Sequence, residues 1–393
     1  MKNQEELLSY RAKFLEPSPM LSLNDKAKQL KEQGVDIVNL TAGEPDGRTP
    51  WSIGKAAKAA LDLGLTHYTP PGGVKELRKA IAGKLRRVNH IPAAWEEVVV
   101  GVGAKQVLSA VFQLLCEPGD EVLIPTPAWG TFIEQARLAD ATPVLMPLKQ
   151  PFVLDAETVH RNLTNRTKIL IVNTPSNPTG SVIPSEELKA IAGILRGRPI
   201  HILADEVYEQ FIYDELSHTS IASLSKETRQ QTITVNSFSK TYAMTGWRVG
   251  YAHTTPLLAQ KLSALNSLTT SGTCSIAQYG ALEAITRTPK ELERMTKQYE
   301  KRRNLVLEQL GKISLLSAVP PKGAFYVFIN IKKALNGKET SAQWCARLLE
   351  KKGVAVVPGE AFAFPGFMRI SFAANRGQLR KGLQRIREFL REE

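Results

Sequence analysis

The chain has 393 residues, of which 43% are hydrophobic and 23% are charged, and it carries a formal net charge of +13. This length and composition are typical of a globular protein with a large buried core and room for two domains. They exclude a membrane-spanning protein, because no run of about 18 apolar residues occurs.

The excess of positive charge raises the alternative of a nucleic-acid or membrane-surface protein, since basic patches attract phosphate groups. The lysines and arginines are, however, spread along the chain. Where they are densest, in residues 376–391, apolar side chains recur at helical spacing, at Leu379, Leu383, Ile386 and Leu390. We therefore predict a packed helix with a solvated face, and neither a nucleic-acid nor a membrane partner.

The cysteines and the first residues indicate a reducing compartment. Cys116, Cys274 and Cys345 are too few and too scattered to predict disulfides or a metal site. The start, Met1–Glu6, is too polar for a signal peptide. A cytoplasmic location is expected.

Between about residues 95 and 255, short apolar runs alternate with amphipathic segments. The runs that predict strands are Val98–Val100, Glu121–Ile124, Ile169–Val172, Ile200–Ala204, Thr232–Val235 and Arg248–Tyr251. Amphipathic segments near residues 105–116, 129–139 and 185–196 predict helices between several of these strands. The alternation predicts an α/β domain with a mainly parallel sheet covered by helices.

Beyond about residue 290 the pattern changes to a long charged helix, short strands at Ala324–Phe328 and Val354–Val357, and a C-terminal helix. This predicts a smaller α+β domain. The expected limits are residues 48–288 for the large domain, and residues 1–47 with 289–393 for the small one. Ligands of open parallel sheets lie beyond the carboxyl ends of the strands, so we look for a site there.

The segment Ser237–Tyr251 carries the strongest functional signal. Lys240 is an amine that can form a Schiff base with an aldehyde, provided that it loses its charge, which desolvation favours. Ser237, Ser239 and Arg248 are hydroxyl donors and a guanidinium of the kind that bind a phosphate. A lysine in such a loop is most often a surface charge. The whole segment, however, resembles the pyridoxal-phosphate attachment segment of the class I and II aminotransferases, the aspartate aminotransferase superfamily of fold type I.

The resemblance extends from about residue 21 to residue 390, and it implies pyridoxal 5'-phosphate as the cofactor. Asp205 ends an apolar run and in isolation reads as a cap of the next segment. The resemblance makes it the carboxylate that pairs with the protonated pyridine nitrogen, so that the ring stays an electron sink. Tyr208 is then a donor to the phenolic oxygen of the cofactor. Asn177, in a turn rich in Asn, Pro and Gly, contacts the same oxygen and the substrate carboxylate.

Gly103, Ala104 and Lys105 open a helix after a strand, where free backbone amides can bind a phosphate. The third glycine of a dinucleotide fingerprint is lacking, which disfavours a dehydrogenase. In the family this turn forms one side of the phosphate site, and the hydroxyls and guanidinium of the Lys240 segment close the other. Trp129, otherwise a core aromatic, corresponds to the residue that stacks on the cofactor ring.

Three further residues match the family, one at the cofactor phosphate and two at the substrate carboxylate. Tyr68 resembles the tyrosine that reaches the phosphate of the neighbouring subunit, which implies a homodimer. Arg369, in the strand-like segment Phe367–Phe372, faces outward or needs a buried partner. It resembles the arginine that holds the substrate α-carboxylate as a bidentate fork. Gly43 resembles the glycine whose backbone lines the same carboxylate site.

The implied reaction is a ping-pong transfer of an amino group from an L-amino acid to a 2-oxo acid such as 2-oxoglutarate, with Lys240 as the general base. A subgroup of the family uses a lysine in the place of Lys105 to bind the distal carboxylate, which favours aspartate or glutamate. Aromatic substrates would stack on Trp129 and Tyr326. The alternative is that Lys105 faces solvent.

Two other classes of function compete. The same scaffold supports carbon–sulfur β-lyases, which release ammonia and an oxo acid without an amino acceptor. A non-catalytic ligand-sensing module, fused to a DNA-binding domain, is the other alternative. It is disfavoured because every catalytic residue of the family is present and no helix-turn-helix segment precedes the enzyme-like region.

Overall fold

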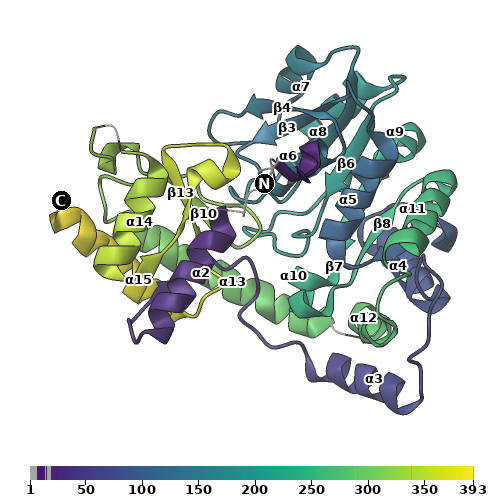
Figure 1. The fold of residues 1–393 in the computed structure, drawn as a ribbon, viewed down its shortest axis with the longest axis horizontal. Coiled ribbons are helices and arrows are strands. Elements are labelled where there is room, and N and C mark those ends of the chain that lie inside the picture. Colours follow the sequence, from purple (N-terminus) through teal and green to yellow (C-terminus); the bar gives the residue numbers. More distant parts are fainter. Residues whose placement is uncertain (1–6, 14, 16–18, 288, 338, 393) are drawn as a thin grey trace.

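A computed structural model describes residues 7–13, 15, 19–287, 289–337 and 339–392. The polar start, Met1–Glu6, lies outside these residues. Figure 1 shows a larger part built around a central sheet, and a smaller part in which the purple α2 lies beside green and yellow helices from the C-terminal third of the chain. The smaller part therefore combines segments from both ends of the chain.

Within the described residues, seven strands form the central sheet, in the order β2-β8-β7-β6-β5-β3-β4. Their bounds are β2 Val98–Gly101, β3 Glu121–Thr126, β4 Thr142–Pro147, β5 Thr167–Asn173, β6 His201–Asp205, β7 Thr232–Ser237 and β8 Gly250–His253. Only β8 runs antiparallel to its neighbours, so the prediction of a mainly parallel sheet is confirmed.

One prediction about this sheet was wrong, and one strand was missed. Arg248 is not in a strand, because it has a left-handed backbone conformation with φ +56°, and β8 begins two residues later. The sequence analysis also missed β4, which contains Pro143 and Pro147. Proline is tolerated there because β4 is an edge strand, with hydrogen-bond partners on one side only.

Both faces of the sheet are covered by helices. In β5, Ile169 and Ile171 pack with α5, α6 and α11, whereas Leu170 and Val172 pack with α8. The bounds are α3 Trp51–Asp62, α4 Lys75–Val88, α5 Gly103–Leu115, α6 Thr131–Leu138, α7 Ala156–Asn162, α8 Ser185–Leu195, α9 Lys226–Gln231, α10 Phe238–Thr241, α11 Pro256–Thr269 and α12 Ser275–Arg287. Strands buried on both faces explain the continuous apolar runs in the sequence.

The smaller part contains a second, antiparallel sheet of order β12-β13-β10-β9 and a two-stranded pair, β1-β11. The elements are α1 Tyr10–Lys13, α2 Pro19–Glu32, β1 Val38–Asn39, α13 Pro289–Leu310, β9 Ser317–Ala318, β10 Tyr326–Asn330, α14 Ser341–Lys352, β11 Val354–Ala355, β12 Val357–Pro358, β13 Phe367–Ser371 and α15 Arg376–Glu392. The run predicted as one strand, Val354–Val357, is therefore divided between two sheets. The parallel pairing of Val38 with Val354 joins the two ends of the chain.

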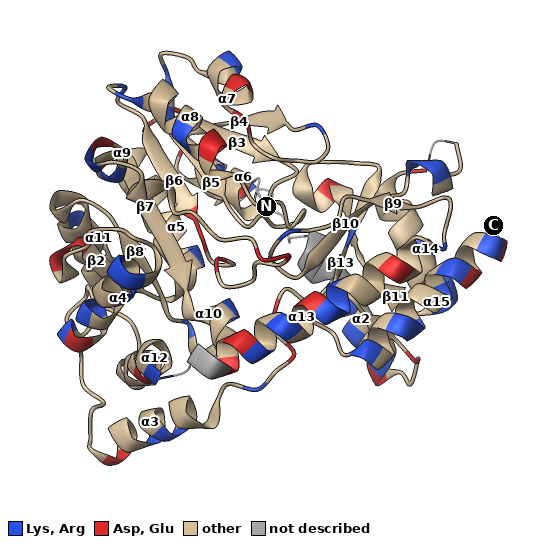
Figure 2. Ribbon diagram, turned by 180° about the vertical axis from the view of Figure 1, so that it is seen from behind, with Lys and Arg blue, Asp and Glu red and all other residues tan. Residues whose placement is uncertain are grey.

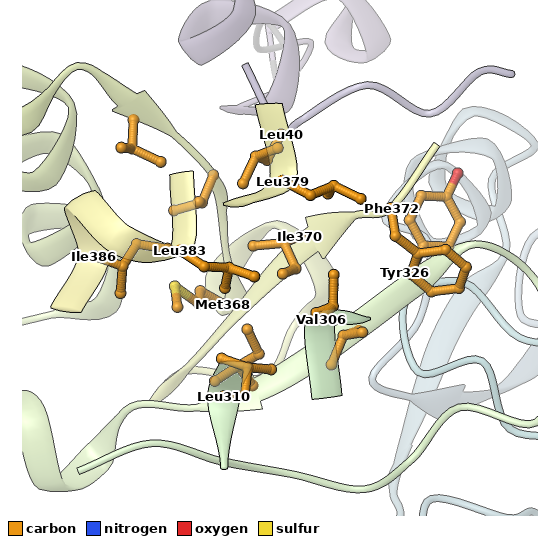
Figure 3. Close-up of a cluster of buried hydrophobic side chains, with 14 of the residues drawn as sticks. Leu40, Val306, Leu310, Tyr326, Met368, Ile370, Phe372, Leu379, Leu383 and Ile386 are labelled. Carbon is orange, nitrogen blue, oxygen red and sulfur yellow. The ribbon is translucent and has the colours of Figure 1, made fainter. Parts of the chain in front are cut away.

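One hydrophobic cluster joins β1, α13, β10, α14, β13 and α15. Figure 3 shows part of it, with side chains from Leu40, which follows β1, and from α13, β13 and α15. The predicted apolar face of α15 is buried at Leu379, Leu383 and Ile386, and Leu390 is partly buried. Figure 2 shows blue and red residues along α13 and mostly blue residues along α15, as expected for charged, solvated faces. None of the described helices has the length and apolarity that crossing a bilayer requires.

Candidate active site

A cavity of about 440 Å³ lies where strands β5, β6 and β7 end and where residues 39–44 of the N-terminal segment meet β10 and β13. Its position beyond the carboxyl ends of parallel strands is the one expected for a ligand site. The predicted residues that line it are Gly43, Ala104, Lys105, Trp129, Asn177, Asp205, Tyr208, Ser237, Ser239, Lys240, Arg248, Tyr326 and Arg369. Gly103 lies next to this lining, against Arg248, and Tyr68 lies apart from it.

Lys240 lies on the short helix α10, which follows β7 directly. Ser237 caps this helix, because its hydroxyl accepts a hydrogen bond of 3.0 Å from the backbone amide of Ser239. The Lys240 ammonium donates to the carbonyl oxygen of Gly43 at 2.5 Å. Burial lowers the pKa of Lys240 to about 8, although the nearby Glu44 carboxylate opposes this shift. The structure therefore holds an amine that loses its proton near neutral pH, which a nucleophile or general base requires.

Asp205 is the last residue of β6 and its side chain is 3% exposed. Its carboxylate accepts a hydrogen bond of 3.3 Å from the backbone amide of Val207. Burial raises the pKa of Asp205 to about 7, and the adjacent Glu206 adds to this effect. A cationic ring nitrogen in the cavity would offset the cost of burying this charge, so a protonated pyridine fits the site.

The other end of the cavity fits a phosphate. Gly103, with φ +78°, begins α5, and a side chain at this position would overlap the Arg248 guanidinium. Arg248 has a left-handed backbone, and its guanidinium lies against the start of α5. The guanidinium also donates a hydrogen bond of 2.7 Å to the carbonyl oxygen of Thr245. The Ser237 hydroxyl donates to that of Ser239 at 2.8 Å. Helix amides, hydroxyls and a guanidinium thus converge on one spot.

Arg369 does not face outward. Its side chain is fully buried, and its guanidinium donates to the Asn177 side-chain oxygen at 2.9 Å and to the Thr41 carbonyl at 2.7 Å. The guanidinium also lies 4.2 Å from the ring centre of Tyr326. These contacts explain how β13 carries a buried cation, since hydrogen bonds and an aromatic face replace water.

Three aromatic residues frame the space between these ends. The hydroxyls of Tyr208 and Tyr326 share a hydrogen bond of 2.7 Å. The Lys105 ammonium lies 5.0 Å from the ring centre of Trp129, and burial lowers the pKa of Lys105, with a further contribution from Arg248. Lys105 therefore borders the cavity while its side chain stays in contact with solvent.

The sequence analysis missed several polar residues of the cavity. Asn173 ends β5 as Asp205 ends β6, and its amide donates to the backbone oxygen of Asp205 at 3.1 Å. Glu44 accepts a hydrogen bond of 2.7 Å from the Thr245 hydroxyl. The position of Asn173 at a strand end was a usable signal, whereas Glu44 and Thr245 meet only through the fold.

Comparison with known proteins accounts for this arrangement. The family model described as "Aminotransferase class I and II" matches residues 35–386. The chain is 43% identical over 390 residues to the probable aspartate/prephenate aminotransferase of Aquifex aeolicus, with 98% of this chain and 99% of that protein covered. It is 39% identical to the aspartate aminotransferase of Bacillus subtilis, with 98% of each covered.

The solved structure of aspartate aminotransferase from Thermus thermophilus with maleate matches this fold with a TM-score of 0.93 at 40% identity, covering 99% of this chain and 100% of that one. The relatives are aminotransferases, so the lyase alternative is not favoured. Because sequence and fold both match over almost their whole lengths, this chain belongs to the class I and II aminotransferases and is a transferase that works with pyridoxal 5'-phosphate.

Proposed function

We propose that this aminotransferase transfers the amino group of aspartate to a 2-oxo acid such as 2-oxoglutarate. The observation that carries this proposal is that one cavity holds both the Lys240 amine, whose pKa burial lowers to about 8, and the buried guanidinium of Arg369. An amine that accepts a proton and a guanidinium that binds a carboxylate are the groups that an amino acid substrate needs.

The cavity residues have separate roles toward the cofactor. All four residues line the cavity: Asp205 would pair with the ring nitrogen, Trp129 would stack on the ring, and Asn177 and Tyr208 would bind the phenolic oxygen. The phosphate is bound by the groups at the start of α5 and by those around α10, which are Gly103, Ala104, Lys105, Ser237, Ser239 and Arg248. Pyridoxal phosphate supplies an electron sink for the carbanion at the substrate α-carbon.

The substrate is held by its two carboxylates. Arg369 binds the α-carboxylate as a fork, beside the backbone of Gly43. Lys105 binds the distal carboxylate. The contact of its ammonium with the Trp129 ring at the cavity wall supports this role. The Aquifex and Bacillus relatives, named for aspartate, agree with an acidic donor. Tyr326 and Trp129 offer aromatic surfaces for a second class of donor.

Lys240 moves the proton. In its neutral form, which predominates above about pH 8, its amine would accept the α-proton of the substrate and hold it at Nζ. The fixed position of α10 behind β7 keeps this amine in the cavity between the two binding ends.

The half-reaction tests the function. We expect aspartate, added without any oxo acid to protein loaded with pyridoxal phosphate, to remove the visible absorption band and to yield one equivalent of oxo acid. The cofactor then remains as its amine form, because no acceptor is present. The measurement is an absorbance spectrum with product quantification, and alanine serves as the control substrate.

A band that aspartate leaves unchanged while aromatic amino acids remove it would contradict the aspartate assignment. Release of ammonia in place of cofactor amination would identify a lyase.

We further propose that the protein is a homodimer in which Tyr68 reaches the cofactor phosphate of the neighbouring subunit. Tyr68 is 92% exposed, and Leu63, five residues before it, and Leu268, in α11, are 75% and 85% exposed. Large exposed apolar side chains of this kind are typical of an interface. The segment is also held from within, because the Gln278 amide donates to the Thr69 hydroxyl at 2.9 Å.

Tyr68→Phe is therefore expected to weaken pyridoxal phosphate binding by about tenfold or more, since a hydrogen bond to a charged group is lost. A fluorescence titration of the cofactor-free protein measures this affinity, and analytical ultracentrifugation shows that the variant has kept its assembly. An unchanged affinity, or a wild-type protein that is monomeric at the same concentration, would contradict the proposal.

The domain limits and the location are proposed on two observations. The pairing of β1 with β11 supports a small domain made of residues 1–47 and 289–393, with residues 48–288 as the large domain. The free thiols of Cys116, Cys274 and Cys345 suit the reducing cytoplasm.

A further inference from the structure

A buried polar cluster lies next to Asp205 but outside the lining of the cavity. Its members come from three places in the chain: α4 and its C-cap, the turn after β6, and the loop that follows. They are Lys84, Asn89, Glu206, Glu209, His218 and Ser220. The sequence analysis assigned these residues no role.

Hydrogen bonds divide the cluster into two linked acid–base pairs. The first pair is Glu206 with His218, at 3.1 Å between the carboxylate and the imidazole Nε2, and the Ser220 hydroxyl donates to the same Glu206 oxygen at 2.6 Å. The second pair is Glu209 with Lys84. Asn89 joins the pairs, because its amide donates to Glu209 at 2.6 Å and to Ser220 at 2.8 Å.

The charges of the cluster balance only if His218 is protonated. Glu206 and Glu209 are 0% and 6% exposed, and Lys84 supplies one positive charge against their two negative ones. An unbalanced charge in such a place is costly. Although burial alone lowers the pKa of His218, the Glu206 and Glu209 carboxylates outweigh it and the net direction is upward.

The other ionisable groups that face the cluster do not change this balance. The phenols of Tyr242 and Tyr251 lie near Glu209, and burial, with the Glu209 charge, raises the pKa of each, so both are neutral. Carboxylate and imidazole atoms of Glu206, Glu209 and His218 lie within 4.8 Å of one another, a spacing that would suit a cation. The Lys84 ammonium already occupies that role toward Glu209.

The cluster is coupled to the active site through Glu206. Glu206 follows Asp205 directly in the chain, and its charge contributes to the raised pKa of Asp205. We propose that His218 is a positioning residue: as the imidazolium partner of Glu206, it cancels the negative charge next to Asp205 in the chain and so sets the pH range in which Asp205 works. This inference depends on the proposed function in one respect, because it takes Asp205 and Lys240 as residues that bind the cofactor.

His218→Gln tests this through the visible spectrum of the loaded protein. The variant leaves one extra negative charge near the site, and a negative charge favours the protonated form of every neighbouring group. We expect the pH midpoint of the cofactor's absorption change to rise by about one unit. The double variant Glu206→Gln/His218→Gln removes both charges, so its midpoint should return close to that of the wild type.

His201→Gln is the matched control. His201 begins the same strand β6, at the end opposite to Asp205, and the variant should leave the midpoint unchanged. If the role of His218 were purely structural, both His218→Gln and the double variant would be less stable than the wild type, and the double variant would not restore the pH midpoint. The proposal would be overturned if His218→Gln left the pH midpoint unchanged, or if the double variant Glu206→Gln/His218→Gln kept the raised midpoint.

A second measurement needs no variant and no cofactor. Nitrogen-15 chemical shifts of His218 in the cofactor-free wild-type protein should report an imidazolium at pH 7, where a histidine with the ordinary pKa of about 6.5 is mostly neutral. A neutral imidazole at that pH overturns the inference even if His218→Gln does not fold. A wild-type protein that develops no visible band with pyridoxal phosphate would instead count against the proposed function, and the His218 shifts would still decide this inference.

Discussion

Lys240→Ala is expected to abolish steady-state transamination and to leave the protein folded. Lys240 is the amine that the cavity holds within reach of both binding ends, hydrogen-bonded to the Gly43 carbonyl. Loss of its attachment and proton-transfer roles should reduce kcat by about 10⁴-fold or more. A coupled assay of oxo acid formation measures the loss.

Stability should not fall with activity. Burial lowers the pKa of Lys240 from 10.5 to about 8, so the folded protein holds this proton less tightly than the unfolded chain does. The shift corresponds to a cost of about 3 kcal/mol below pH 8, which disappears as the pH rises toward 10.5. Removing the amine removes this cost, and the Tm of cofactor-free Lys240→Ala at pH 7 should equal or exceed that of the wild type.

Lys261→Ala, which removes an exposed lysine of α11, is the control and should retain full turnover. Lys240→Ala protein with unimpaired turnover would refute the assignment of the catalytic amine. A variant that loses its far-ultraviolet circular dichroism would contradict the expected stability.

Lys84→Met should produce the largest loss of stability among the substitutions considered. Lys84 is 7% exposed and pairs with Glu209, which is 6% exposed. Removing the ammonium leaves a buried carboxylate whose remaining partner is the Asn89 amide. We expect the free energy of unfolding to fall by about 3–5 kcal/mol, as measured by chemical denaturation of the cofactor-free protein.

A second substitution separates the charge from the packing. In Lys84→Met/Glu209→Gln no buried charge is left at this pair, so much of the lost stability should return. The exposed Lys79→Met, on the same helix α4, should change stability by less than about 0.5 kcal/mol. A Lys84→Met protein as stable as the Lys79→Met control would refute the importance of the buried pair.

The pH dependence has a definite sign. Although burial opposes it, the Lys84 charge holds the pKa of Glu209 below its usual value of 4.5. The stabilisation from this pair is therefore present above about pH 4.5 and is lost as the pH falls through the lower pKa of the folded protein. The difference in stability between the wild type and Lys84→Met should narrow over that acidic range.

Local sequence patterns predicted the elements of the central sheet well. The apolar runs that correspond to β3, β5, β6 and β7 are strands buried on both faces. Because both faces are buried, apolar residues follow one another without interruption in the middle of β3, β5 and β6, which makes these strands easy to predict from sequence. The predicted α/β class, the smaller second part and the aminotransferase family follow from these runs and from the contiguous Lys240 segment. Each of these signals lies within a few residues of the feature it predicts.

The ends of strands were harder to predict than their centres. Arg248 lies in an apolar run that looks like a strand, but its backbone is left-handed and its guanidinium packs against Gly103, far earlier in the chain. β4 was not predicted because it contains two prolines, which cannot donate a backbone hydrogen bond and are therefore rare in strands. Proline is compatible with β4 because this strand lies at the edge of the sheet. An edge position is a property of the assembled sheet.

The sequence by itself determined which residues bring chemistry to this protein: Lys240 in its segment, Asp205 at a strand end, and Asn177 in its turn. Only the tertiary structure decided their neighbours. Arg369 meets Asn177 across 192 residues of chain, and Lys84 meets Glu209 across 125. The physical reason is that charge balance and desolvation depend on which side chains are buried together, and distant segments of the chain come together only when the cores of the fold form.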